Sequence, residues 1–223
     1  MIVGAVLALN CRPARGSLPV RVDRAGCLAG AGIDGDIHAD ALSPRQLLLA
    51  GAGVYQDLSL PPHALHENLL LDLDTAQLVS GTVLQVGDEV GLRMMFQCEA
   101  CGQLDAIQPR LATRIGNRRG MLARVLSGGT IRVGDAVRDL GVLAPAWSED
   151  WRVRVRRVLD AVPADAVIEY RHLARLAGIQ SSYCRAFPRL IAGFGASYAG
   201  KAVSAQSGST RERWDGRDLF DVA

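Results

Sequence analysis

The sequence GTVLQVGD at residues 81–88 returns in shortened form as GTIRVGD at residues 129–135. Each copy is a short β-type run that ends in a Gly-Asp turn, and each leads into another apolar run. We predict that each copy forms a hairpin with the run that follows it. A similarity this short does not indicate a solenoid repeat. Two hairpins among many short strands instead predict a small mixed β-barrel.

The segments before this repeat add strands and one helix to the predicted barrel. Residues 1–9 are almost entirely apolar and predict a first strand, and residues 18–23 alternate apolar with polar side chains, as a half-buried strand does. Ser43 suits a helix N-cap and Pro44 suits a first helical position. We therefore predict a helix that begins there and continues through residue 56.

Composition and charge limit the functions that the chain can have. It has 223 residues, 49% of them hydrophobic, and a formal net charge of only +2, so its overall charge does not indicate nucleic-acid binding. Its five cysteines are an odd number without the spacing of a secreted disulfide framework. The first nine residues are too short to span a bilayer and carry no basic residue. These features predict a cytoplasmic protein with free thiols and no membrane partner.

A helical pattern begins after residue 146 and divides the sequence into residues 1–143 and 147–223. The second segment is the more basic, with 12 basic and 9 acidic residues. Ser148 can cap a first helix with apolar residues at helical spacing, and a short β run at residues 166–168 follows it. A second helix then ends at Gly178, a residue type favoured just after a helix C-terminus.

A third helix is predicted after a short turn, with Ser181 as its N-cap. Helix, short turn with glycine, and helix is the pattern of a helix-turn-helix unit. Pro188 falls inside this third helix, where it should produce a kink. Arg185 and Arg189 are four residues apart and would share one face of the helix. Residues 201–204 are the predicted strand of a wing.

Two cysteines at CxxC spacing, Cys98 and Cys101, follow an apolar run. They can be two buried thiols with a structural role. A zinc site needs two further ligands, and Cys11 and Cys27 are sixteen residues apart, which matches no zinc knuckle. A thioredoxin-like redox pair requires a βαβ context instead of a barrel. The remaining functional hypothesis is a single thiolate used as a metal ligand or as a sulfur carrier.

Three other polar clusters have both a functional and a structural explanation. Residues 32–38 (GIDGDIH) contain two carboxylates and an imidazole, but Asp-Gly turns are common. Residues 66–68 (HEN) can be a solvated loop before a strand at residues 69–71. Residues 114–120 combine arginines with glycines, which suits a phosphate site or simply a solvated surface. No cluster is decisive alone, whereas their order and intervals are informative.

Taken together, residues 1–143 resemble the MOSC domain, the module named after the C-terminus of molybdenum cofactor sulfurase. The resemblance implies an α+β protein built on a β-barrel of mixed strands. It is carried by many separate matches in the same order. These are residues 32–38, Arg45-Gln46, residues 62–69, Gly81-Thr82 with residues 86–88, residues 98–101, and Arg119-Gly120 with residues 129–135.

The MOSC resemblance implies a molybdenum cofactor (molybdopterin), with Cys101 as the metal ligand or the carrier of sulfur. It also implies an oxidoreductase that removes oxygen from a small N-hydroxylated substrate and draws electrons from a partner protein. The alternative is a cofactor or sulfur carrier without turnover. His66 stands where many members have glycine before Glu-Asn. The residues expected at the cofactor are Asp36, His38, Arg45, His66, Glu67, Asn68 and Arg119.

Residues 151–208 resemble the DNA-binding part of O6-alkylguanine DNA alkyltransferases and alkyltransferase-like proteins. The matches are residues 158–163, 169–174, 176–178 and 185–187. The resemblance implies a small winged-helix domain over residues 147–223. It implies that Tyr170 rotates a nucleotide out of the duplex and that Arg185 fills the gap, as chemistry on a stacked base requires. Arg189 is the third residue expected at nucleic acid.

The chain departs from the alkyltransferase pattern at the reactive motif. The family's Pro-Cys-His-Arg would fall near residues 199–202, which contain no cysteine, and Cys184 is not the alkyl acceptor. We therefore expect no alkyl transfer. Two hypotheses remain for residues 147–223: weak DNA binding, as in a DNA-lesion sensor, or a degenerate winged-helix appendage that packs on the barrel.

Overall fold

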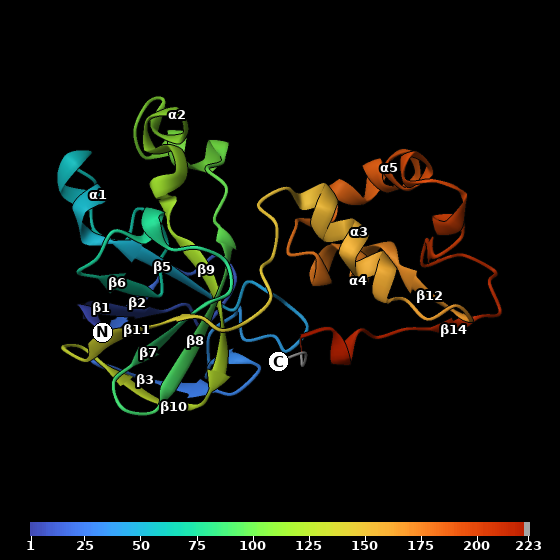
Figure 1. The fold of residues 1–223 in the computed structure, drawn as a ribbon. Coiled ribbons are helices and arrows are strands. Elements are labelled where there is room, and N and C mark those ends of the chain that lie inside the picture. The colour runs from blue at the N-terminus through green and yellow to red at the C-terminus, as the bar shows by residue number, and fades with distance from the viewer. Residues whose placement is uncertain (221–223) are drawn as a thin grey trace. The chain divides into compact units, whose positions relative to one another are not determined.

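The computed structural model describes residues 1–220, and the chain divides into two compact units (Figure 1). The first unit comprises residues 1–41 and 45–147, and the second comprises residues 42–44 with the chain from residue 148 onward. In residues 1–220, no helix combines the length and the apolar character needed to cross a bilayer.

Seven strands of the first unit close into a barrel in the order β11-β7-β8-β9-β5-β6-β1, and β1 pairs with β11 to complete the ring. All of these pairs are antiparallel except β5–β6, which is parallel, so the predicted mixed barrel is confirmed. β2 (Val20–Val22) extends the sheet beyond β1. The barrel strands are β1 (Ile2–Cys11), β5 (Leu47–Gly51), β6 (Leu69–Leu71), β7 (Thr82–Val86), β8 (Val90–Gln97), β9 (Met121–Ser127) and β11 (Ala136–Val142).

The two copies of the sequence repeat have different structures. The first forms the predicted hairpin of β7 and β8, with Val86 opposite Val90. The second was predicted wrongly, because β10 (Gly129–Arg132) pairs with β3 (Arg24–Leu28) in a three-stranded sheet with β4 (Gly32–Ile33). The turn after β10 is hydrogen-bonded to β1, because the Val6 carbonyl accepts from the Gly134 amide at 2.8 Å. β11 therefore pairs with β1 and β7, and not with β10.

The predicted helix from Ser43 to residue 56 is wrong over its first half. Residues Leu47–Gly51 form β5, and only Ala52–Asp57 form a helix, α1. All five residues of β5 are buried, because the strand lies between β6 and β9 in the barrel wall. A short apolar run that is buried on both sides has no alternation, and its sequence does not distinguish a strand from a helix.

A second apolar cluster lies outside the barrel core. The barrel core contains residues such as Leu49 and Met94, whereas the second cluster joins α1 to α2 (Leu111–Ile115) and to the 3₁₀ turn η2 (Gly102–Ala106). Figure 1 shows α1 and α2 at the same end of the barrel. Leu104 of η2 is 1% exposed in this cluster, so its packing anchors the chain that follows the CxxC pair. Two more 3₁₀ turns are η1 (Thr75–Gln77) and η3 (Gly116–Arg119).

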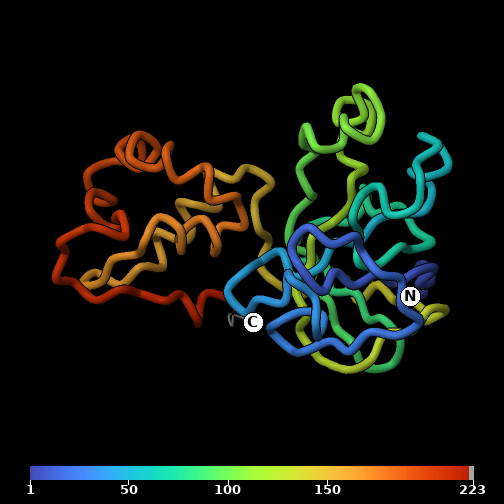
Figure 2. Tube along the Cα trace, turned by 180° about the vertical axis from the view of Figure 1, so that it is seen from behind, coloured from blue at the N-terminus to red at the C-terminus, as the bar shows by residue number. Residues whose placement is uncertain are grey.

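Within residues 148–220, the second unit combines three helices with three short parallel strands in the order β13-β12-β14. Figure 2 shows its Cα trace, in the orange to red part of the colour bar. The predicted β run is confirmed as β12, and Gly178 follows the second helix with φ of 66°. The elements are α3 (Trp151–Ala161), β12 (Ala166–Glu169), α4 (Tyr170–Leu176), η4 (Ser181–Ala186), α5 (Phe187–Phe194), η5 (Ala196–Tyr198), β13 (Ala202–Val203), β14 (Glu212–Arg213) and η6 (Arg217–Phe220).

Two helix starts differ from the prediction. The N-cap of α3 is Asp150, whose carboxylate accepts from the Arg152 amide at 2.8 Å, and not Ser148. The third helix from Ser181 is instead the 3₁₀ turn η4 followed by α5. Pro188 stands in the first turn of α5, where no backbone N–H is needed, so it starts this helix and does not kink it.

The predicted wing strand does not form a wing hairpin. β13 runs parallel to β12, with Ala202 opposite Ile168, whereas a hairpin requires antiparallel neighbours. Lys201 directly precedes β13 and links it to the end of α3, because its Nζ donates to the carbonyls of Leu159 at 2.8 Å and Val162 at 3.3 Å. A cation at the C-terminus of α3 satisfies its last carbonyls and is favoured by the helix dipole.

The first testable prediction concerns Gly120, which precedes β9. Its φ is +131°, and a Cβ there would lie 2.3 Å from the Leu49 carbonyl oxygen. We expect Gly120→Ala to lower the free energy of unfolding by about 2 kcal/mol or more, because it combines backbone strain with a clash in the barrel wall. Gly53→Ala is the control, since a Cβ at this position in α1 meets nothing within 4 Å. Urea unfolding should show no loss of stability for Gly53→Ala. Equal stabilities of the two variants would contradict the close approach of Gly120 to the Leu49 carbonyl.

Candidate functional site

The residues predicted at the cofactor come from segments that flank five strands. Asp36 and His38 lie in the loop after β4, and residues 66–68 lie just before β6. Arg45 precedes β5, and Arg119 precedes β9. The barrel holds these segments in place, while the loops carry most of the polar side chains. The two cysteines lie after β8, at the entrance to η2.

Cys98 is held inside the protein. Its amide donates to the Gly120 carbonyl at 2.7 Å, which extends the β8–β9 pairing by one step, and its side chain is only 3% exposed. Burial raises the pKa of the Cys98 thiol, although the guanidinium groups of Arg119 and Arg45 oppose this effect. Arg45 Nη2 lies 4.0 Å from Cys98 Sγ. Cys98 is therefore a neutral, enclosed thiol near neutral pH.

Cys101 is more accessible than Cys98 and is half-buried. Arg119 Nη1 donates to Cys101 Sγ at 3.2 Å and to the Glu99 carbonyl at 2.5 Å. The Cys101 carbonyl accepts from the Leu104 amide at 3.0 Å, which fixes the backbone of the cysteine to η2. Cys101 thus presents a positioned sulfur beside a guanidinium that can balance a negative charge on it.

Asp36 connects the loops on the other side of the site. One carboxylate oxygen accepts from the Arg12 amide at 2.8 Å and from Asn68 Nδ2 at 3.0 Å. The other accepts from the His38 amide at 2.8 Å and lies 3.0 Å from His38 Nδ1. Burial acts to raise the pKa of Asp36, but the hydrogen bonds from His38 and Arg12 outweigh it, so the net pKa is lowered. Asp36 is a buried carboxylate that remains ionised.

Asn68 and Glu67 are turned into the protein. Asn68 Nδ2 also donates to the Asn10 carbonyl at 3.3 Å, and Asn68 Oδ1 accepts from the Leu48 amide at 3.0 Å. Glu67 is 2% exposed and accepts from the Tyr55 hydroxyl at 2.5 Å. Burial raises the pKa of Glu67, and the Tyr55 hydrogen bond acts in the opposite direction. Both side chains thus position the loop before β6 through contacts within the chain.

His66 contacts Arg12, a residue of the Asp36 side of the site. Its backbone is in the left-handed region, with φ of 60°, and its Nδ1 contacts Arg12 Nη2. Burial lowers the pKa of His66, and Arg12, Arg119 and His38 lower it further by repelling a positive charge. His66 is thus linked to the Asp36 side by its contact with Arg12, and to the thiol side only through the electrostatic influence of Arg119, which contacts Cys101. The imidazole is therefore neutral near pH 7.

The sequence did not identify Arg12, Asn10 or Tyr55 as parts of this site. Arg12 follows β1 and is adjacent to both Asp36 and His66. Asn10 donates to the Glu67 carbonyl at 3.2 Å and is 1% exposed. The only signal in the sequence was the polar residue Asn10 at the end of the apolar run of β1, and it indicated no particular function. Arg12 and Tyr55 lie in no recognisable motif.

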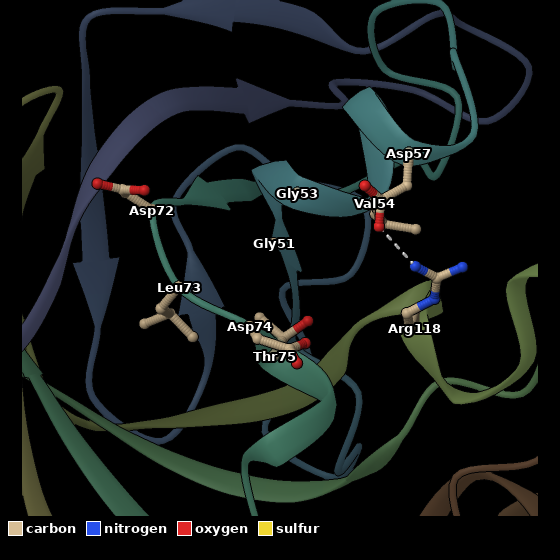
Figure 3. Close-up of a pocket in the computed structure, with 9 residues that line it drawn as sticks. All are labelled: Gly51, Gly53, Val54, Asp57, Asp72, Leu73, Asp74, Thr75 and Arg118. Atoms are coloured by element: carbon tan, nitrogen blue, oxygen red, sulfur yellow. Dashed lines mark hydrogen bonds and ion pairs between the residues drawn. The ribbon is translucent and has the colours of Figure 1, made fainter.

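A pocket of about 370 Å³ lies beside the site and contains none of its predicted residues (Figure 3). Arg118 lines this pocket and pairs with Asp57 at 2.9 Å, whereas the neighbouring Arg119 contacts Cys101. The pocket is lined by Gly51, Gly53, Val54, Asp57, Asp72, Leu73, Asp74, Thr75 and Arg118. Of the arginines in the predicted phosphate segment, Arg119 belongs with the thiols and Arg118 does not. Arg114 instead donates to Gln108 Oε1 at 3.1 Å.

The second testable prediction follows from the lowered pKa of His66. Because the folded protein disfavours protonated His66, the unfolded chain binds the proton more readily, and stability is lost as the pH falls below about 6.5. Protonation also places a hydrogen on Nδ1, which then faces the Arg12 guanidinium. We expect His66→Gln to lose less stability than the wild type between about pH 7 and pH 5. The test is to measure the urea midpoints of both proteins across this pH range. If the midpoints of the wild type and His66→Gln changed in parallel with pH, His66 would not be held neutral by the fold.

A comparison with models of known protein families gives a match in the segment that contains most of the barrel strands. Residues 43–138 match the model of the MOSC domain. No curated protein matches the chain. The family model ends before residues 151–208, so the alkyltransferase resemblance of that segment remains a prediction.

Several solved structures have a similar fold. The YuaD protein of Bacillus subtilis is 18% identical, with a TM-score of 0.52 over 60% of this chain and 93% of its own. YiiM of Geobacillus stearothermophilus is 15% identical, with a TM-score of 0.51 over 84% of this chain and 98% of its own. YiiM of Escherichia coli is also 15% identical, with a TM-score of 0.51 over 95% and 100%. Residues 43–138 are thus similar to the MOSC domain, and the fold of the chain is similar to that of YiiM.

Proposed function

We propose that this protein is a molybdenum-cofactor-dependent oxidoreductase that removes oxygen from small N-hydroxylated compounds, with Cys101 as the protein ligand of the metal. The observation that carries the proposal is the half-buried Cys101 sulfur, which accepts from Arg119 Nη1 at 3.2 Å beside an enclosed second thiol. Thiolates are soft ligands that suit metals of this kind. The MOSC family match supports the same assignment.

The residues at the site fit an anionic pterin cofactor. Three guanidinium groups, those of Arg12, Arg45 and Arg119, lie around the thiols and His66. Arg12 Nε and Arg119 Nε are buried and have no hydrogen-bond partner in the part of the chain that the structure describes. Buried donors normally have an acceptor, so the two free N–H groups suit the oxygens of a bound phosphate. The site therefore has both the sulfur and the cations that the cofactor needs.

Each side chain has a separate task in this proposal. Cys101 supplies the thiolate, and Arg119 orients it and balances its charge. Cys98 stays protonated and supports the turn, while Arg45 and Arg12 provide positive charge for the pterin phosphate. Asp36 and Asn68 hold the surrounding loops through their mutual hydrogen bond of 3.0 Å. When bound, the cofactor supplies a metal centre that can take up oxygen and exchange electrons.

The electrons must come from outside the site. Reduction of an N-hydroxy group consumes two electrons and two protons and releases water. Residues 30–35 (GAGIDG) fit the spacing of a dinucleotide-binding loop, but they lead from β3 into β4 and a turn. That loop requires a helix directly after it, because the helix N-terminus binds the pyrophosphate. We therefore propose an electron-donor protein as the partner of this enzyme.

The third testable prediction separates the two cysteines. We expect Cys101→Ser to abolish bound molybdenum and N-hydroxy reduction, because a hydroxyl is too hard and too weakly acidic to replace a thiolate. Cys98→Ser is the matched control and should retain a measurable fraction of both. Metal and pterin analysis of protein from a cofactor-producing host should give about one of each per wild-type chain. Equal losses in both variants would indicate a two-cysteine site, and full activity in Cys101→Ser would exclude this assignment.

The same metal analysis distinguishes the reductase from a non-catalytic protein. A sulfur carrier would need Cys101 but would bind no stoichiometric molybdenum, and a DNA-lesion sensor would need neither. Wild-type protein without molybdenum and pterin would therefore favour one of these alternatives. Loss of sulfur transfer in Cys101→Ser, measured with a labelled persulfide donor, would then identify the carrier.

We infer a second candidate function, weak DNA binding by the second unit, from two exposed arginines. Arg185 in η4 and Arg189 in α5 are exposed, and no acidic side chain among residues 1–220 pairs with either. Tyr170 packs edge-on against Phe187, with ring centroids 5.8 Å apart, so it is partly engaged in the core of the unit. Exposed, unpaired guanidinium groups are available to phosphates.

The fourth testable prediction addresses this DNA binding. If the second unit neutralises about three phosphates, the log–log salt slope of its affinity should be about −3. Arg185→Ala should lower affinity for duplex with an alkylated guanine more than for intact duplex. Titration of fluorescent duplexes into the whole protein at two salt concentrations measures both effects. Absence of binding in every condition would favour an appendage without a role in DNA recognition.

A further inference from the structure

His66 adopts a backbone conformation that its side chain does not favour. Its φ is 60°, and in residues 1–220 only Ser59, His63 and Arg110 share a positive φ without being glycine. Left-handed conformations are uncommon for residues with a Cβ and concentrate at functional sites. Glycine would adopt this conformation more readily. The chain therefore places an imidazole at a position where the backbone alone would favour glycine.

Arg12 determines which nitrogen of His66 carries the hydrogen. Arg12 Nη2 contacts His66 Nδ1, and a guanidinium can only donate hydrogen bonds. Nδ1 is therefore the acceptor, which assigns the ring hydrogen to Nε2 from the hydrogen-bond network. The other groups that act on the ring are Arg119 and His38, and both disfavour a charge on it. The result is a neutral imidazole with its N–H on the side away from Arg12.

The Nε2–H group of His66 has no acceptor among the described residues. Although the ring is partly desolvated, His66 as a whole residue is exposed, so a ligand can approach it from outside the chain. It also belongs to the same electrostatic cluster as Arg119, which contacts the Cys101 sulfur. A fixed, neutral donor of this kind can bind an oxygen atom without adding charge to the site. A similar arrangement, a neutral histidine that polarises a substrate oxygen, is known in other enzymes.

We propose that His66 is a substrate-binding residue that donates a hydrogen bond from Nε2–H to the hydroxyl oxygen of the N-hydroxylated compound, and that Arg12 is the positioning residue that maintains this tautomer. This inference rests on the proposed function. The proton of Nε2 is not transferred: the N–O bond breaks with two electrons from the donor protein and two protons from water, and the oxygen leaves as water. His66 selects and orients the oxygen that leaves.

Two substitutions at His66 test the hydrogen bond without a folding defect. His66→Gly removes the donor and suits the left-handed backbone, while His66→Asn keeps an amide donor in a residue that tolerates this conformation. Ser59→Gly is the matched control, because Ser59 has φ of 51° and lies outside the site. With a panel of amidoximes, hydroxamic acids and hydroxylamines, we expect His66→Gly to lower kcat/KM about tenfold at unchanged molybdenum content. His66→Asn should restore part of this loss, and Ser59→Gly should show none.

The pH profile gives a second kinetic signature. Wild-type activity should fall as the pH drops below about 6.5, because protonated His66 presents a hydrogen toward the Arg12 guanidinium and the ring must move. His66→Asn should lack this acidic limb. An identical limb in wild type and His66→Asn would overturn the role of His66, even if both proteins are active.

The tautomer itself can be measured without the cofactor. In the cofactor-free protein, ¹⁵N NMR should show a pyridine-like Nδ1 and a pyrrole-like Nε2 for His66, and Arg12→Gln should allow the other tautomer to appear. A wild-type ring with its hydrogen on Nδ1 would overturn the inference whatever the activity. Wild-type protein that lacks molybdenum and reduces no compound of the panel would overturn the proposed function and this inference together. Normal wild-type activity with no change in His66→Gly would overturn only the inference.

Discussion

The buried carboxylate of Asp36 is the interaction on which the arrangement of the loops depends. It is 5% exposed and accepts hydrogen bonds from the Arg12 amide, the His38 amide and the Asn68 side chain. These partners come from the end of β1, the loop after β4 and the loop before β6. A buried charge without such partners would be strongly unfavourable, so the three segments can only pack together when all donors are in place. Removal of Asp36 would leave two backbone donors of the site, the Arg12 and His38 amides, without this acceptor.

This arrangement gives the site two layers with different roles. Asp36, Asn68 and Glu67 use their polar atoms within the chain and set the positions of the loops. Cys101, Arg119, Arg12 and His66 stand on these loops and keep atoms available to a ligand. The polar residues most evident in the sequence are thus partly structural. The layer that is open to a ligand includes Arg12, which has no recognisable motif.

The sequence predicted the barrel and the neighbourhood of the thiols, because both depend on local patterns. β7 and β8 form a hairpin between residues that are close in sequence, and the Gly-Asp turn identifies it. The pairing of β10 with β3 joins segments about a hundred residues apart, and no turn signal can reveal such a partner. The sequence pattern predicts a helix at β5 because a run buried on both sides has no periodicity that would identify a strand. Arg12 reaches His66 through the pairing of β1 with β6, which is also non-local.

The position of Lys201 has a consequence for chemical labelling. It is the only lysine in the sequence, and its amine donates to two carbonyls at the end of α3. Besides the amino terminus, an amine-directed reagent therefore has a single side-chain target, and that target is engaged while α3 and β13 are in place. The rate of acylation at Lys201 would report local opening of the second unit alone. The chain thus contains its own single-site probe of that unit, without any engineered residue.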